Sequence, residues 1–209
     1  MRRLLLLVLL ALLAWFPVSS LAGYTHFDSV RPLTMVRMNQ QTHTTELANI
    51  CTVSGINAKK RYWLTAAHCI DGDEPKYIVG ERIRVIMRDV INDIAIVQTP
   101  LASVPALRLS QHTPEVEDIA KVIGHPFGYV YPFMTTGTIA SVYALLDDDP
   151  VPYMIIAAPG APGNSGSPIL DARYEIISVL QIGWGRNVFS PVMGGATYDV
   201  LARYRSYWE

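Results

Sequence analysis

The segment Gly163–Pro168 reads Gly-Asn-Ser-Gly-Ser-Pro and leads directly into a short apolar run. Glycine permits backbone conformations and close backbone approaches that other residues resist. A serine between glycines, ahead of a buried strand, is therefore typical of a tight loop that presents one hydroxyl group. Backbone N–H groups in such a loop can stabilise a developing oxyanion. An ordinary Gly/Pro/Ser turn has the same composition, so this segment alone leaves both interpretations open.

Two further segments supply the groups that a nucleophilic serine needs. A serine hydroxyl is a weak nucleophile at neutral pH and requires an adjacent base, a role that suits the pKa of histidine. A buried carboxylate can orient the imidazole and stabilise its protonated form. His68 and Asp93 both adjoin short apolar runs, and they precede Ser165 in the order base, acid, nucleophile. We therefore predict that these three side chains form a catalytic triad.

The order of the candidate residues argues against other hydrolase classes. All five histidines precede Ser165, whereas an α/β-hydrolase places its histidine after the nucleophile. A subtilisin-like order requires an aspartate before the histidine, and only Asp28 precedes His68. The cysteines and histidines do not match the sequence spacings of zinc sites, so we expect neither a metal site nor a cofactor.

The N-terminal 22 residues are typical of an export signal. Two arginines precede the apolar run 4–16, and small residues follow at Ser20 and Ala22, just before Gly23. The apolar run is shorter than the roughly 20 residues of a bilayer span. We predict a secreted or periplasmic protein with no membrane attachment after cleavage at residue 22. An uncleaved anchor is the alternative.

The charge balance argues against a nucleic-acid partner. The chain has a net charge of −1, and its longest basic run is Lys59–Arg61. Surfaces that bind nucleic acids carry many more cations, because they neutralise phosphates. We therefore expect no nucleic-acid partner.

Cys51 and Cys69 are the two cysteines of the chain. An oxidising compartment allows them to pair, and the bridge would close a loop with His68 at its edge. For a loop of this length the chain-entropy model gives roughly 3 kcal/mol of stabilisation. Two unpaired buried thiols are the alternative.

From Leu33 onward the chain consists of short apolar runs separated by turn residues. The runs are rich in Val, Ile, Tyr and Thr and are about four to eight residues long, as strands are. Two sets of about six such runs flank a polar, proline-rich segment, which predicts an all-β pair of barrels. The expected divisions are a flexible mature N-terminus at 23–32, a first barrel at about 33–100, a linker at about 101–117, a second barrel at about 118–199 and a C-terminal helix at about 200–208.

From Leu33 to its end the chain resembles the chymotrypsin-like (trypsin-fold) serine peptidases. Thr65–Cys69 is similar to the histidine box of that family, Asp93–Val97 to its aspartate box and Gly163–Pro168 to its serine box. Val122–Gly128 and Thr136–Ile139 resemble the second barrel of glutamyl-endopeptidase-like and Deg-type bacterial relatives. The resemblance implies two six-stranded antiparallel β-barrels with the active site between them.

The resemblance also implies the role of each residue in a serine endopeptidase that acts on protein or peptide substrates. Ser165 would attack the scissile carbonyl and form an acyl-enzyme, His68 would transfer the proton, and Asp93 would hold His68. The N–H groups of Gly163 and Ser165 would form the oxyanion hole. The interval from His68 to Asp93 is short for the family, which makes Asp89 a competitor. Asp93 is favoured because a strand-like apolar run follows it.

The resemblance also indicates which segments form the walls of the specificity pocket, because they can be aligned with those of related peptidases. No acidic residue lies on the wall 157–162, and a leucine stands where glutamyl endopeptidases have the histidine that reads glutamate. A neutral, apolar or small side chain is therefore expected at the cleaved residue. The predicted pocket residues are Pro159, Gly160, Leu180, Gln181 and Ile182.

Asn164 stands where activated zymogens of the family have the aspartate that pairs with a new N-terminus. We therefore expect activity without any cleavage beyond removal of the signal. No peptide-binding domain is expected after the barrels, and so no Deg-type assembly through one. Two alternatives stay open, namely a catalytically silent trypsin-fold binding protein and a peptidase that acts only on its own chain or on one partner.

Overall fold

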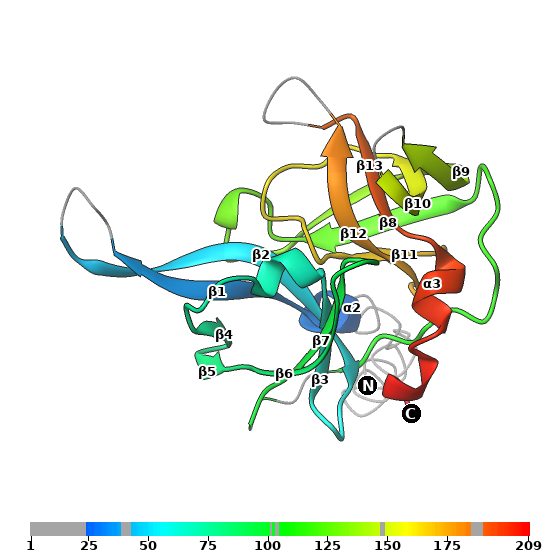
Figure 1. Ribbon diagram of the computed structural model, residues 1–209. Coiled ribbons are helices and arrows are strands. Elements are labelled where there is room, and N and C mark those ends of the chain that lie inside the picture. The colour runs from blue at the N-terminus through cyan, green and yellow to red at the C-terminus, as the bar shows by residue number, and fades with distance from the viewer. Residues whose placement is uncertain (1–23, 39–42, 101, 103–104, 147–148, 185–189) are drawn as a thin grey trace, which may run out of the picture.

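The computed structural model describes residues 24–38, 43–100, 102, 105–146, 149–184 and 190–209. The predicted export signal at 1–22 lies outside these residues. The described part consists of antiparallel strands in two groups, with a few short helical turns (Figure 1). Within it, no helix has the length and apolar character needed to cross a bilayer.

The first group is a seven-stranded sheet with the strand order β5-β4-β1-β2-β3-β7-β6. Its β1–β2 pair forms a long ribbon that projects from the body of the molecule (Figure 1). The strands are β1 (Val30–Met38), β2 (Thr45–Asn57), β3 (Tyr62–Thr65), β4 (Lys76–Ile78), β5 (Glu81–Arg82), β6 (Arg84–Asp89) and β7 (Ile94–Gln98).

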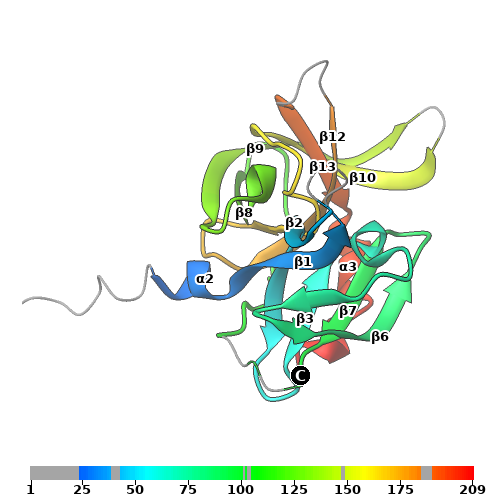
Figure 2. The same cartoon turned by 90° about the vertical axis from the view of Figure 1, so that its left-hand side faces the viewer.

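The second group is a six-stranded barrel whose ladders run in the closed order β10-β13-β12-β11-β8-β9. Its longest pair, β9 with β10, extends beyond the barrel wall as a second ribbon (Figure 2). The strands are β8 (Ile119–Gly124), β9 (Phe133–Leu146), β10 (Asp149–Ala157), β11 (Pro168–Leu170), β12 (Ile176–Trp184) and β13 (Val192–Ala196).

The all-β class is confirmed, but the first group is an open seven-stranded sheet and not the six-stranded barrel expected. Residues 76–89 divide into three short strands. Val79 and Gly80, with φ of 51° and 78°, form the turn that separates β4 from β5. This positive-φ turn makes β4 and β5 a small hairpin at the edge of the sheet, where β5 pairs with β4 alone.

The expectation of a flexible N-terminus at 23–32 is wrong for its described part. The helix α2 (Tyr24–Asp28) is followed at once by β1, which begins at Val30. Val30 is fully buried and pairs with Ser54 of β2. Contacts with residues distant in the sequence bury this segment. Its own sequence therefore needs no alternating pattern and shows none.

The C-terminal helix is present but shorter than predicted, and it begins earlier. The helix α3 covers Tyr198–Ala202, and a separate 3₁₀ turn, η4, covers Arg205–Tyr207. Two further 3₁₀ turns, η2 (Ala67–Ile70) and η3 (Pro126–Gly128), lie within the two groups of strands.

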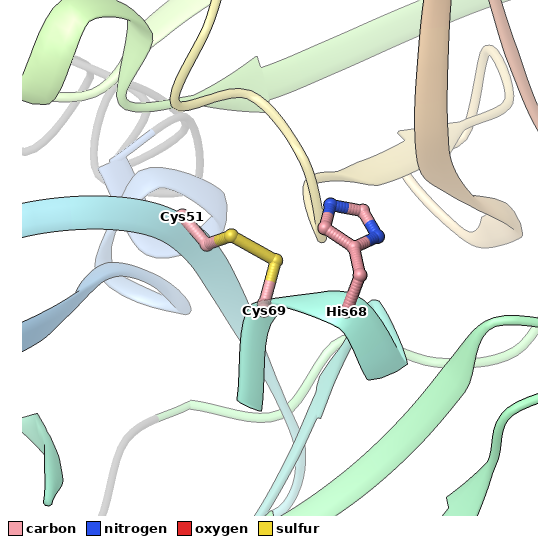
Figure 3. A group of neighbouring side chains, drawn as sticks. All are labelled: Cys51, His68 and Cys69. Carbon is pink, nitrogen blue, oxygen red and sulfur yellow. A yellow bond between two sulfur atoms is a disulfide. The ribbon is translucent and has the colours of Figure 1, made fainter. Parts of the chain in front are cut away.

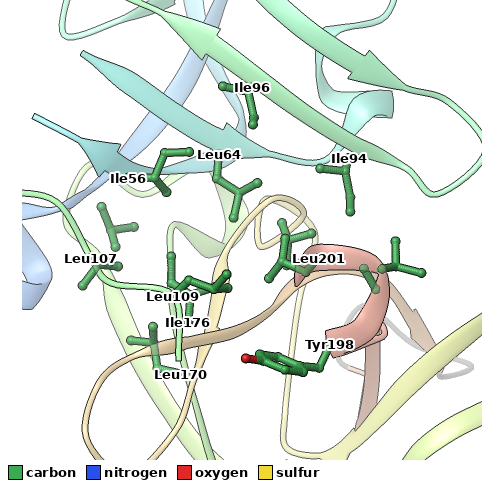
Figure 4. Close-up of a cluster of buried hydrophobic side chains, with 14 of the residues drawn as sticks. Ile56, Leu64, Ile94, Ile96, Leu107, Leu109, Leu170, Ile176, Tyr198 and Leu201 are labelled. Carbon is green, nitrogen blue, oxygen red and sulfur yellow. The ribbon is translucent and has the colours of Figure 1, made fainter. Parts of the chain in front are cut away.

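The largest hydrophobic cluster joins the two groups of strands (Figure 4). Leu64 and Ile94 face Leu170 and Ile176, and Leu201 of α3 packs between them. The linker takes part as well, through the buried side chains of Leu107 and Leu109. Each such side chain contributes about 1.5–3 kcal/mol through burial. The two halves are therefore held in one fixed relation, which fixes any site between them.

Candidate active site

His68 lies on η2, directly after β3, and its side chain points away from the core. The flanking residues Ala67 and Cys69 are buried, whereas 43% of the His68 side chain is exposed. Cys69 forms a disulfide with Cys51 of β2, with 6.0 Å between their Cα atoms (Figure 3). The buried neighbours and the disulfide fix η2 in place and leave the imidazole at the surface.

Asp93 lies in the turn between β6 and β7 and uses both carboxylate oxygens on His68. Its Oδ2 lies 2.7 Å from the imidazole Nδ1, and its Oδ1 accepts the backbone N–H of His68 at 2.8 Å. An ionised carboxylate only accepts hydrogen bonds, so Nδ1 carries the proton. The other ring nitrogen, Nε2, is then left with a free lone pair, as a general base requires.

The competing carboxylate, Asp89, is engaged elsewhere. It accepts hydrogen bonds from the Tyr204 hydroxyl and from the backbone and side chain of Asn92. Burial tends to raise the pKa of Asp89, but these hydrogen bonds hold it below its usual range. Burial and the bond to Asp89 raise the pKa of Tyr204 to about 12. Asp89 therefore attaches the C-terminal segment to the β6–β7 turn and makes no contact with His68 among the described hydrogen bonds.

Gln181 supports the aspartate turn from the other half of the molecule, a contact that no pattern in the sequence indicates. Its side-chain amide donates to the carbonyls of Asn92 at 2.6 Å and Asp93 at 3.0 Å. Asp93 has a φ of 50°, a left-handed conformation that an aspartate adopts at a cost. The two bonds from β12 therefore hold a strained turn, and no sequence signal links residues 88 positions apart.

The serine loop is bonded to the strand that carries Cys51. The N–H of Thr52 donates to the carbonyl of Ser165 at 2.8 Å, and the Thr52 hydroxyl donates to the carbonyl of Gly163 at 2.9 Å. Thr52 adjoins Cys51, whose disulfide partner adjoins His68. Figure 3 shows the yellow loop that precedes β11 passing beside the imidazole. The loop with Ser165 is thereby bonded to β2 across the boundary between the two halves, and among the described hydrogen bonds none joins Ser165 directly to His68.

Gly166 allows this close approach. Its φ is +81°, and a Cβ atom there would lie 2.2 Å from both the Thr52 carbonyl oxygen and the Thr65 hydroxyl. Any other residue would push the serine loop away from β2 and β3. The glycine after the serine is thus required by the contact between the two halves.

Two backbone N–H groups of the serine loop are available to a ligand. The φ of Gly163 is +95°. Among the described residues, neither the Gly163 N–H nor the Ser165 N–H donates to a protein acceptor, whereas the Asn164 N–H bonds to Ala161 at 3.1 Å. An oxyanion hole requires two free N–H donors beside the nucleophile. The N–H groups of Gly163 and Ser165, on either side of Asn164, can supply them.

The five residues predicted for the specificity pocket do not share one wall. Pro159 and Gly160 line a cavity of about 380 Å³ together with aromatic residues of the segment 126–133. Leu180 is buried in the core of the barrel, and Gln181 points to the aspartate turn. Ile182 faces Gly194, where an added Cβ would lie 3.2 Å from it. The backbone of Leu180 still supports the serine loop, through the Gly166 N–H at 2.8 Å.

His125 lies beneath the serine loop and is almost fully buried. Its Nδ1 lies 3.0 Å from the Tyr129 carbonyl, and its backbone N–H donates to the Thr52 hydroxyl at 3.0 Å. Burial lowers the pKa of His125, and the carbonyl of Tyr129 offsets this only in part. Thr52 thus links His125 to Gly163, which makes His125 part of the support of the loop.

A family model decides what kind of domain this is. The trypsin-like peptidase domain matches residues 53–179, which include His68, Asp93 and Ser165. The chain belongs to the trypsin-like peptidase family. The resemblance to chymotrypsin-like serine peptidases is thereby confirmed.

Curated relatives of the chain are Deg-type proteases. It is 31% identical over 134 residues to Protease Do-like 2, chloroplastic, of Arabidopsis thaliana, a match that covers 56% of this chain and 21% of the relative. It is 30% identical over 125 residues to a probable periplasmic serine endoprotease DegP-like of Pseudomonas savastanoi pv. phaseolicola, with 56% and 26% covered. The matched part is thus about a quarter of the length of these relatives.

Solved structures confirm the fold. The HtrA-type protease AlgW with a decapeptide superposes with a TM-score of 0.75 at 18% identity, over 90% of this chain and 66% of that one. AlgW with a tripeptide gives a TM-score of 0.72 at 22% identity, over 92% and 64%. This trypsin-like domain therefore shares the fold of the part of AlgW, about two thirds of that chain, on which it superposes.

Proposed function

We propose that this trypsin-like domain is a serine endopeptidase in which Ser165, His68 and Asp93 act as nucleophile, base and orienting acid. The observation that carries the proposal is the bidentate contact of Asp93 with His68, which leaves Nε2 as the free base. The serine loop is bonded to the strand beside this pair through Thr52. A histidine oriented only for packing would not need its lone pair kept free at the surface.

In the proposed reaction, Nε2 of His68 takes the proton of the Ser165 hydroxyl as the oxygen attacks the scissile carbonyl. The Gly163 and Ser165 N–H groups stabilise the oxyanion of the tetrahedral intermediate. His68 then gives the proton to the leaving amine, and an acyl-enzyme remains. Water, activated by the same nitrogen, hydrolyses the ester and restores the serine.

The substrate is proposed to be a polypeptide outside the cytoplasm. The AlgW structures with a decapeptide and a tripeptide support a peptide ligand for this fold. The names of the relatives include a periplasmic and a chloroplastic protease, and the N-terminal segment has the pattern of an export signal. The apolar cavity beside Pro159 and Gly160 supports a preference for a neutral side chain near the cleaved bond.

A fluorophosphonate probe followed by digestion of a peptide library tests the proposal. The wild-type chain should be labelled at Ser165 and should cleave many library peptides, whereas Ser165→Ala should do neither. Ser167→Ala, which removes a neighbouring hydroxyl, serves as the matched control for labelling. No labelling of the folded protein would favour a binding protein. Labelling without turnover of the library would favour a peptidase limited to one partner.

A further inference from the structure

The cavity of about 380 Å³ beside the serine loop lies between the wall 159–161 and the segment that runs from η3 into β9. Asn164, which separates the two proposed oxyanion donors Gly163 and Ser165, also lines it. Among the described residues that line the cavity, none belongs to η2 or β12. The cavity therefore reaches the serine loop through Asn164 and not through the proposed base.

Three aromatic side chains that line the cavity are unusually exposed. Phe127, Tyr129 and Phe133 are 43%, 55% and 51% exposed. The rings of Phe127 and Tyr129 meet edge to face with their centroids 6.4 Å apart, and the centroids of Tyr129 and Phe133 are 5.5 Å apart. Aromatic rings that gather around a hollow at the surface are typical of a binding site, because a further ring can pack against them.

Two polar side chains at the cavity have a buried oxygen without a partner. Asn164 is 5% exposed, and its Oδ1 accepts no hydrogen bond from any described residue. The hydroxyl of Thr135, on β9, is also buried and has no partner within the described part of the chain. Buried polar groups of folded proteins are nearly always paired. An amide oxygen accepts a hydrogen bond and a threonine hydroxyl can donate one, so the two groups suit a ligand atom that does both.

We propose that this cavity binds a neutral aromatic ring with a hydroxyl group, that is, a phenol. The hydroxyl donates to Oδ1 of Asn164 and accepts from Thr135, while the ring packs against the three aromatic side chains. None of the described residues that line the cavity carries a charge, so an ionised ligand would find no counter-charge there. The same chemistry is offered by the side chain of a tyrosine in a polypeptide and by a free phenol.

The volume of the cavity fits this ligand. Binding sites for small molecules measure about 300–1,000 Å³, and a dry cavity of about 150 Å³ already holds benzene. A volume of about 380 Å³ therefore accommodates one substituted ring and the atoms attached to it. It leaves no need for the aromatic walls to move apart.

A ligand in the cavity would act on the serine loop. The N–H of Phe127 donates to the carbonyl of Pro162 at 2.6 Å, so η3 is bonded to the residue that precedes Gly163. A hydroxyl held by Asn164 restricts that residue and with it the two N–H groups that flank it. Donors that are fixed in advance are the ones that stabilise a developing oxyanion. This link to cleavage rests on the proposed function, whereas the binding site itself does not.

Fluorine NMR of 4-fluorophenol with the Ser165→Ala chain tests the site without any reference to cleavage. The folded chain should broaden the fluorine signal in a saturable way, and both p-cresol and toluene should displace the probe. Thr135→Val keeps the shape of the side chain and removes its hydroxyl. It should reduce the preference for p-cresol over toluene about 3- to 10-fold, as expected for the loss of one hydrogen bond. Thr136→Val, at the exposed neighbour on β9, is the matched control and should leave the preference unchanged.

Phe133→Ala and Tyr131→Ala separate the cavity from the aromatic surface in general. Both side chains are at least half exposed, so neither truncation should unfold the chain. Phe133→Ala should weaken the binding of 4-fluorophenol about 2- to 10-fold through loss of a ring contact. Tyr131 does not line the cavity, and its truncation should have no effect. Absence of saturable binding, equal weakening by both truncations, or an unchanged preference in Thr135→Val would overturn the site.

Peptide cleavage by the wild-type chain separates the two sources of the phenol. If the source is a tyrosine of the substrate, p-cresol should raise KM at constant kcat. The library products should then be enriched in tyrosine at one position, and Thr135→Val should lose this enrichment. If the source is a free phenol, p-cresol should change kcat at constant KM.

The same assay tests the link to the serine loop. Cleavage that does not respond to saturating p-cresol would overturn this link. Binding of 4-fluorophenol by a chain that never cleaves peptides would reject the proposed function and leave the phenol site standing.

Discussion

The two halves of the molecule hold their parts of the site in different ways. The closed barrel of β8–β13 has every strand paired on both sides, and it carries the serine loop without a covalent link. The open sheet of β1–β7 carries the histidine and the aspartate, and it has the disulfide. The disulfide joins η2, which follows the interior strand β3, to β2, so the turn that carries His68 is held covalently.

Each half also supports the site residues of the other. Gln181 of the closed barrel holds the Asp93 turn, and Thr52 of the open sheet holds the serine loop. The contacts that position the proposed triad therefore include contacts between the two halves. Substitutions within the open sheet, such as loss of the disulfide, should therefore act mainly on stability. Substitutions at the interface between the two halves, such as that of Gln181, should shift the site residues while the protein remains folded.

The largest effect is expected for Asp93→Asn. An amide in place of the carboxylate favours the wrong tautomer of His68, and kcat should fall about 10⁴-fold. The measurement is steady-state hydrolysis of a peptide found in the library digest. Asp89→Asn is the matched control and should change kcat by less than about tenfold. It should mainly lower stability, because the partly buried Asp89 carboxylate accepts hydrogen bonds from Asn92 and Tyr204, and a hydrogen bond to a charged group is worth about 1.5–3 kcal/mol. A larger loss for Asp89→Asn would reverse the assignment of the acid.

The disulfide should account for much of the stability of the open sheet. The paired change Cys51→Ser and Cys69→Ser should lower the free energy of unfolding by roughly 3 kcal/mol, because the bridge restricts the unfolded chain. Urea denaturation followed by tryptophan fluorescence measures it. Unchanged stability would mean that strand pairing alone fixes η2.

Gln181→Leu should lower both the rate and the stability. The change leaves the carbonyls of Asn92 and Asp93 without their donor, which costs about 1–3 kcal/mol. We expect kcat to fall about 10- to 100-fold as the strained turn relaxes, with KM nearly unchanged. Gln181→Asn retains the amide on a shorter side chain and should recover only part of the rate. An equal rise of KM with constant kcat would instead place Gln181 at the substrate.

The smallest expected effect is a loss of stability at acid pH that depends on His125. Burial holds its pKa in the folded state below the ordinary value of 6.5. The unfolded chain therefore binds the proton more readily, so the stability present above about pH 6.5 falls as the pH drops toward the folded-state pKa. The slope is at most about 1.4 kcal/mol per pH unit.

Urea titrations at several pH values should show a shallower decline for His125→Asn than for the wild type. His112→Asn, at an exposed histidine, is the control and should follow the wild type. An identical decline in all three proteins would locate the acid sensitivity elsewhere.

Several features could be predicted from the sequence because they depend on local chemistry. Short apolar runs predict strands wherever they occur, so the all-β class followed from composition and turns alone. Ser165, His68 and Asp93 were singled out because each lies in a segment whose neighbours are typical of its role. The pairing of Cys51 with Cys69 likewise followed from the presence of two cysteines behind a predicted export signal.

Other features depend on contacts between distant residues, and no local pattern encodes them. The alignment with related peptidases predicts Gln181 on a specificity wall, but its side chain reaches the Asp93 turn instead. Val30 was assigned to a flexible segment because its neighbours show no period, yet burial against β2 orders it. In both cases the position of the residue is set by its contact with a residue far away in the sequence, the Asp93 turn for Gln181 and Ser54 of β2 for Val30.

The sequence by itself determined which chemical groups the protein has and in which order they occur. Only the tertiary structure decided that Asp93, and not Asp89, contacts His68 and that one half of the molecule supports the loops of the other. The physical reason is that strand pairing acts over long separations, so side chains meet according to register and packing and not according to their distance along the chain.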